Sequence, residues 1–132
     1  MYVVVIDDDD DVLEWCRIIL EADGFTVDCF NDPSIAFNAI KVNRPDILVS
    51  DLMMNNLDSG FELAAKVKSL PGYEELPIIL MSAASTRHGY DFIPRNDDDL
   101  RAMHIDAFMA KPAEANKLLS KIRELVVRST KK

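Results

Sequence analysis

The sequence predicts a doubly wound α/β domain, in which a five-stranded parallel sheet carries helices on both faces. Short runs rich in apolar and β-branched residues alternate five times with stretches whose apolar residues recur at helical spacing. Several of these runs are continuously apolar, which is typical of parallel strands buried on both faces. The alternation implies right-handed strand–helix–strand crossovers. A chain of 132 residues has the length of one such domain.

The first half of the chain is expected to form three strands and two helices. Strands are expected over Val3–Ile6, Phe25–Phe30 and Ile47–Ser50. The first helix follows a run of five Asp and ends at Gly24, a residue type that favours helix C-termini. Asp32 is the expected N-cap of the second helix, because the Pro after it suits a first helical position. The residues expected to face the core from these two helices are Val12, Leu13, Cys16, Ile19, Leu20, Ile35, Ala36, Ala39, Ile40 and Val42.

The second half is expected to continue the same alternation. After a loop over Met53–Ser59, a helix is expected from about Gly60 to Leu70, where a Pro-Gly pair ends it. The fourth and fifth strands are expected over Ile78–Met81 and Ala107–Ala110, with a short helix near Asp97–Met103 between them. The final helix, residues 113–128, is expected to bury Leu118, Leu119, Ile122, Leu125 and Val126.

The charge composition excludes several classes of function. The chain has 15 basic and 23 acidic side chains, a net charge of −8, and residues 1–60 hold 13 acids against 3 bases. Such acidity repels phosphate backbones and anionic lipid, so neither nucleic acid nor a membrane is an expected partner. The glycines are too dispersed for a nucleotide-binding loop. Cys16 and Cys29 lack metal-site spacing and are expected to be reduced, buried residues of a cytoplasmic protein.

Polar residues follow the expected strands at the points where these strands end. Asp7 and Asp8 follow the first strand, Asp51 the third, Ser82 the fourth and Lys111 the fifth. Ligands of open parallel sheets bind at this edge, so these side chains are expected to share a cleft. Clustered carboxylates need a cation to stay ionised, and oxygen ligands favour Mg²⁺. Lys111 would then contact a phosphoryl group, with Ser82 donating a hydrogen bond.

The segments VVVIDDDDD, PDILVSDLMM, PIILMSA and FMAKP closely resemble the receiver domain of two-component response regulators. The resemblance extends from residue 2 to about residue 127. We therefore expect a receiver domain over residues 1–127 and a polar tail, or the start of a linker, over residues 128–132. The resemblance implies a flavodoxin-like fold with strand order 2-1-3-4-5. It also implies a domain that accepts a phosphoryl group from the phosphohistidine of a sensor histidine kinase or a phosphotransfer protein.

By this resemblance, Asp51 is the phosphoacceptor and the neighbouring acids form a metal site. Asp7 and Asp8 match the family's acidic pair, with Asp8 the more direct ligand. Together with Asp51 and the main-chain carbonyl of Met53, they would bind Mg²⁺, for which Mn²⁺ could substitute.

The same resemblance implies a switch that catalyses only its own phosphorylation and dephosphorylation, and not an enzyme acting on other molecules. Lys111 would contact the phosphate and the Ser82 hydroxyl would be drawn toward it. Phe108, three residues before Lys111, would then turn inward. The implied output is a changed surface around the fourth helix, the fifth strand and the fifth helix. This surface would contact a downstream protein, or a second copy of the chain in a homodimer.

Three features depart from the family's pattern. Asn55 stands where Pro is common, and one extra residue precedes Gly60, so this loop is expected to alter the phosphorylation rates. The segment before the fifth strand is longer than usual. Its extra material, within Ser85–Asp99, is either a tolerated surface insertion or a partner-docking segment. His104 stands where Gly is common.

Two alternatives stay open at this point. The pattern Asp8-x-Asp10-x-Val12 after an apolar strand also fits the opening motif of haloacid-dehalogenase-like phosphatases. In such an enzyme Asp8 would be the nucleophile and Asp10 the general acid, but Asp51 would have no role. The other alternative is a pseudo-receiver, a binding module that takes no phosphate.

Overall fold

The expected architecture is confirmed in a computed structural model, which describes residues 1–51, 59–82, 105–110 and 114–130. Five parallel strands form one sheet in the order β2-β1-β3-β4-β5. The strands are β1 (Tyr2–Ile6), β2 (Thr26–Phe30), β3 (Ile47–Asp51), β4 (Ile78–Ser82) and β5 (Ala107–Ala110). The described helices are α1 (Asp10–Ala22), α2 (Pro33–Val42), α3 (Ser59–Lys68) and α6 (Ala115–Thr130).

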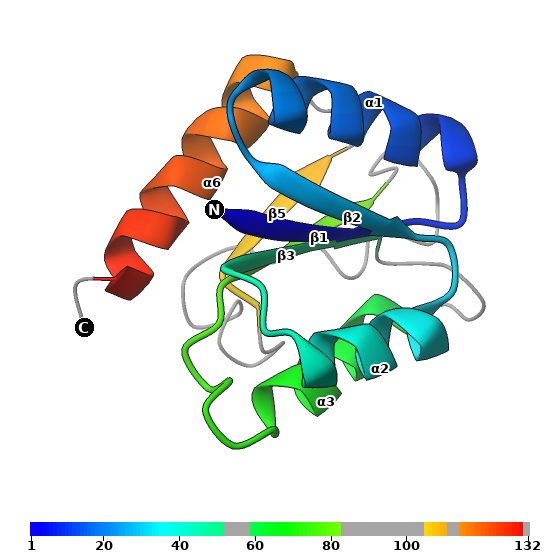
Figure 1. Cartoon of the computed structure of the whole chain (residues 1–132), viewed down its shortest axis with the longest axis vertical. Coiled ribbons are helices and arrows are strands. Elements are labelled where there is room, and N and C mark those ends of the chain that lie inside the picture. Colours follow the sequence, from blue (N-terminus) through cyan, green and yellow to red (C-terminus); the bar gives the residue numbers. More distant parts are fainter. Residues whose placement is uncertain (52–58, 83–104, 111–113, 131–132) are drawn as a thin grey trace.

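Two apolar layers hold the helices onto the sheet. Helices α1 and α6 cover one face, and α2 and α3 cover the other (Figure 1). Successive strand residues point to opposite faces, so Val3 and Val5 pack with the α1 and α6 side chains. Val4 and Ile6 pack with those of α2 and α3. This explains why β1 is apolar from Val3 to Ile6, since all four side chains are fully buried.

The ends of α1 follow the sequence signals closely. Asp9 is the N-cap and its side chain accepts a hydrogen bond from the backbone N–H of Asp11. At the other end Gly24 has φ of 95°, a left-handed conformation that side chains with a Cβ adopt rarely. The Gly24 and Phe25 N–H groups donate to the carbonyls of Glu21 and Leu20, which closes the helix in a Schellman motif. The chain can therefore turn back directly into β2.

Two of the core positions expected in α2 are wrong. The helix begins as expected after the Asp32 N-cap, and Ala36 and Ile40 are fully buried. However, Ile35 is 59% exposed and Val42 is 89% exposed. Val42 follows Ile40 by two residues, which places it roughly 200° around the helix and away from the sheet.

Other differences concern element ends and one cysteine. The strand β2 begins at Thr26 and not at Phe25, and α3 ends at Lys68, two residues before the expected end. Cys16 is buried as expected, whereas Cys29 is only partly buried. The helix expected near residues 97–103 lies outside the described residues, as does the loop over residues 53–58. Among the helices that the structure describes, none combines the length and apolar content needed to span a membrane.

Candidate functional site

Three carboxylates come together at the carboxyl ends of two neighbouring strands. Asp7 directly follows β1, and Asp51 is the last residue of β3, which pairs with β1 in the sheet. Asp7 is fully buried and Asp51 is 6% exposed, whereas Asp8 is exposed. One oxygen from each of the three carboxylates lies within 4.8 Å of the others. The cluster joins residues that are more than forty positions apart in the sequence, as the sheet-edge argument predicts.

The backbone around Asp7 explains how one run of Asp serves two purposes. The Asp7 N–H donates to the carbonyl of Phe30 at 3.1 Å, which fixes this residue beside the end of β2. Its Oδ1 accepts a hydrogen bond from the Asp9 N–H at 2.9 Å, which turns the chain toward α1. Asp9 then caps the helix, and Asp10 and Asp11 lie in its first turn. Negative charge is favourable there, because it interacts with the positive end of the helix dipole.

The donor set of the cluster suits a hard divalent cation. Carboxylate oxygens held this close repel one another, and two of the three side chains have little contact with water. A cation between them would offset this repulsion. Oxygen-only ligands with an exposed side, here that of Asp8, fit Mg²⁺, which keeps several of its waters when it binds proteins.

The other predicted site residues are described only in part. Ser82 is the last residue of β4 and lies opposite Ala110, while Met81 lies opposite Asp51, so the backbone of Ser82 reaches the same edge of the sheet. Phe108 is partly buried, pairs with Leu80 and packs against the apolar core beneath α2 and α3. Met53 and Lys111 lie outside the described residues. The roles assigned to these residues and to the acids stay predictions.

A cleft that the sequence did not reveal lies beside the start of α1. Its volume is about 240 Å³, and it is lined by Asp10, Leu13, Cys29, Phe30, Asn31, Asp32 and Ile35. The Cys29 thiol donates to the carbonyl of Leu13 at 3.7 Å, and burial raises the pKa of this thiol. A raised pKa disfavours the reactive thiolate. The cleft was missed because its lining comes from three elements and contains no recognisable spacing.

Comparisons with known proteins agree with this fold. A family model described as the response regulator receiver domain matches residues 3–123. The response regulator MprA of Mycobacterium leprae is 32% identical over 133 residues, which are 98% of this chain and 52% of that protein. The chain thus spans about half the length of the MprA proteins that it matches. An uncharacterized 14.6 kDa protein of Leptolyngbya boryana is 32% identical over 114 residues, 80% of this chain and 86% of that protein.

Solved structures share the fold at lower identity. A CheY-like response regulator receiver domain protein from Methanospirillum hungatei has a TM-score of 0.82 and 20% identity, with 98% of this chain and 96% of that chain covered. A response regulator receiver domain protein from Clostridium thermocellum has a TM-score of 0.80 and 20% identity, with the same coverage.

Proposed function

The chain belongs to the response regulator receiver domain family, and we propose that it is a phosphorylation-dependent switch with Asp51 as phosphoacceptor. The observation that carries the proposal is the grouping of Asp51 with Asp7 and Asp8 at the carboxyl ends of adjacent strands. The proposed phosphodonor is the phosphohistidine of a sensor histidine kinase or a phosphotransfer protein. The phosphatase alternative gave Asp51 no role, whereas in the fold it lies within the acidic cluster.

The proposed transfer is an in-line displacement at phosphorus. A carboxylate oxygen of Asp51 attacks the phosphorus atom, and the phosphorus–nitrogen bond to the donor imidazole breaks, with its electron pair staying on the imidazole. Asp7, Asp8 and Asp51, with the main-chain carbonyl of Met53, would hold Mg²⁺, or Mn²⁺ in its place. When bound, this cation neutralises charge between the attacking carboxylate and the phosphoryl oxygens. Lys111 would stabilise the charge on the remaining oxygens.

The proposed response passes from the phosphate to the β5 strand. Ser82 ends the strand next to Asp51 and would donate its hydroxyl to a phosphoryl oxygen. Phe108 would then turn further inward against the core that it already touches. The surface that includes β5, α6 and the expected fourth helix would change with it. The proposed partners of this surface are a downstream protein or a second copy of the chain. The proposed location of the protein is the cytoplasm.

Intact mass spectrometry after incubation with acetyl phosphate and Mg²⁺ tests the function. We expect one added phosphoryl group, about 80 Da, which is labile to base and stable to acid. Asp51→Asn should abolish the addition and Asp8→Ala should impair it. Asp11→Asn is a matched control, because it removes one charge from the same Asp run outside the cluster, and it should leave the addition intact.

Two other results would each select an alternative. Phosphate found on Asp8, or hydrolysis of phosphomonoesters that survives Asp51→Asn, would indicate a phosphatase. A protein that gains no phosphate from acetyl phosphate or from a phosphorylated kinase would be a pseudo-receiver.

A further inference from the structure

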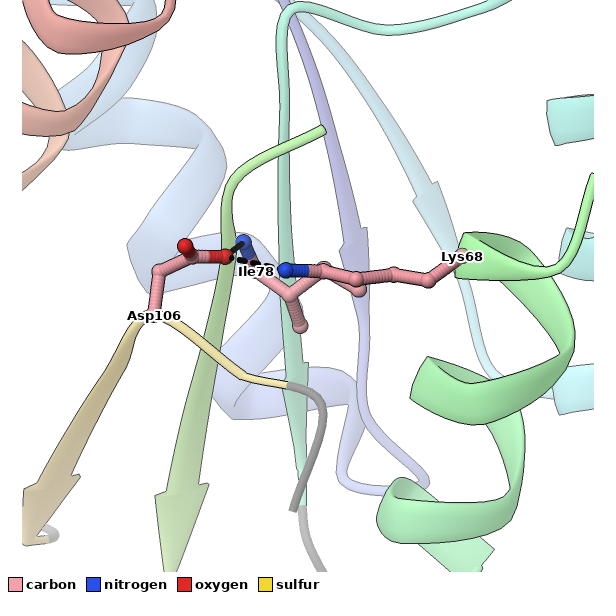
Figure 2. A network of polar contacts seen from close by, with 3 residues as sticks. All are labelled: Lys68, Ile78 and Asp106. Atoms are coloured by element: carbon pink, nitrogen blue, oxygen red, sulfur yellow. Dashed lines mark hydrogen bonds and ion pairs between the residues drawn. The ribbon is translucent and has the colours of Figure 1, made fainter. Parts of the chain in front are cut away.

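The amino end of β5 is tied to two other elements through one carboxylate. Asp106, the residue before β5, accepts hydrogen bonds on its Oδ2 atom from the Ile78 N–H and from the Lys68 Nζ, each at 2.8 Å. Figure 2 shows how Lys68 reaches from the end of α3 toward the same oxygen that faces the start of β4. The Asp106 N–H donates in return to the Ile78 carbonyl, also at 2.8 Å. We call this arrangement of Lys68, Ile78 and Asp106 the β5 anchor.

The β5 anchor is placed where such contacts are worth more than at an open surface. The Lys68 side chain is 17% exposed and the Asp106 side chain 34% exposed, so solvent screens the ion pair less than it would screen a fully exposed pair. The preceding residue, Ile105, is 2% exposed and belongs to the core beneath α2 and α3. The start of β5 is therefore held by an ion pair, two backbone contacts and a buried side chain.

The position of the β5 anchor relates it directly to the switch residue. Phe108 follows Asp106 by two residues, a separation of about 7 Å along a strand, and both side chains lie on the α3 side of the sheet. At the other end of β5, Ala110 pairs with Ser82. Phe108 thus lies between a fixed amino end and a carboxyl end that adjoins the proposed phosphate site.

We propose that Asp106 and Lys68 are positioning residues for the switch, an inference that rests on the function proposed above. With its amino end held to β4 and α3, β5 cannot slide as a unit when contacts change at its carboxyl end. The change is passed to the Phe108 side chain instead. Without the β5 anchor, part of the free energy of phosphorylation is lost in strand movement and less of it acts on Phe108.

Fluorine NMR of the full chain, with trifluoromethyl-phenylalanine at position 108, tests this inference. The populations of the inward and outward positions of the side chain at residue 108 are measured with and without acetyl phosphate and Mg²⁺. Intact mass gives the phosphorylated fraction of each sample. We expect Asp106→Ala to reduce the effect of phosphorylation on the inward–outward equilibrium constant by about threefold or more. Lys68→Met removes the charge but keeps an aliphatic side chain, and it leaves the contacts between Asp106 and Ile78 in place. It should therefore give a smaller reduction of the same phosphorylation effect.

Asp46 offers a matched control at another strand pair of the sheet, β1 with β3. It precedes β3 as Asp106 precedes β5, its Oδ2 accepts from the Tyr2 N–H at 2.7 Å, and its N–H donates to the Tyr2 carbonyl at 2.8 Å. Asp46→Ala therefore removes the same kind of strand clamp, and it should leave the Phe108 response unchanged.

Each remaining outcome overturns a stated idea. If Asp106→Ala and Lys68→Met respond to phosphorylation like Asp46→Ala, the β5 anchor only stabilises the fold and the inference is wrong. Thermal unfolding of each variant identifies losses that come from stability alone. A wild-type protein that gains no phosphate by mass overturns the proposed function, and this inference falls with it.

Discussion

Replacing Asp51 by Asn gives opposite predictions for the metal-free and the metal-bound protein. The oxygens of Asp7 and Asp51 lie within 4.8 Å, and both side chains are nearly excluded from water. At an effective dielectric constant of about 20, two unit charges at this separation repel by about 3.5 kcal/mol. Structural relaxation and salt reduce what a substitution recovers, so we expect metal-free Asp51→Asn to be about 1–3 kcal/mol more stable than wild type.

A bound cation should reverse the effect of Asp51→Asn on stability. If Mg²⁺ binds the cluster as proposed, and not the unfolded state, it should stabilise the folded chain, because each carboxylate is then attracted to the ion. Asp51→Asn removes the charge of one of the three clustered carboxylates. We therefore expect the variant to lose most of the stabilisation that Mg²⁺ gives to the wild type.

Differential scanning calorimetry with a chelator and with added Mg²⁺ measures both effects. At about 3 °C per kcal/mol for a chain of this size, metal-free Asp51→Asn should melt roughly 3–9 °C above metal-free wild type. Asp11→Asn lies outside the cluster and should shift neither the metal-free midpoint nor the Mg²⁺ response. A metal-free Asp51→Asn that is no more stable than wild type, and that keeps the full Mg²⁺ response, would refute the electrostatic description of the site.

Two further predictions concern the fold. Burial raises the pKa of Tyr2 from 10.0 to about 12, with further contributions from its hydrogen bond to Asp28 and from the charge of that carboxylate. The neutral phenol is thus favoured in the folded state, and the associated stability is complete below pH 10 and is lost as the pH rises through 12. An ultraviolet titration should show one tyrosine that ionises with a midpoint near pH 12. The midpoint should fall in Asp28→Asn, and the transition should be absent in Tyr2→Phe. In α2, Ile40→Ala should cost about 2–5 kcal/mol, whereas Val42→Ala should change stability by less than about 0.5 kcal/mol. Urea unfolding of both variants measures the difference, and equal costs would contradict the burial pattern of the helix.

Much of the fold was predictable because its signals are local. The apolar runs predicted all five strands, and the order of the sheet followed from the family resemblance. The caps at Asp9, Gly24 and Asp32 depend only on a residue and its near neighbours. The acidic cluster was predictable for a different reason. Parallel strands bring their carboxyl ends to one edge, so topology alone places Asp7 beside Asp51.

The features that sequence did not predict depend on phase and register. Apolar periodicity marked α2 as amphipathic. Ile35 and Val42 are apolar, but their positions around the helix axis point them away from the sheet, and both are exposed. The contacts of Asp106 require the pairing of β4 with β5 and the end of α3 to be known together, and these lie up to 38 residues apart. A lone Asp before a strand carries no signal of such a partner.

The two ends of the sheet use aspartate in opposite ways, and the polarity of the backbone gives the reason. The amino ends of parallel strands present N–H groups, so an Asp there finds donors, as Asp46 does at Tyr2 and Asp106 does at Ile78. The carboxyl ends present carbonyl oxygens, which are acceptors and add to the negative potential of any carboxylate beside them. Asp7 and Asp51 lie at that end, where a cation is the natural complement. The same residue type therefore holds strands together at one edge of this sheet and, at the other, forms a carboxylate cluster that could hold a metal ion.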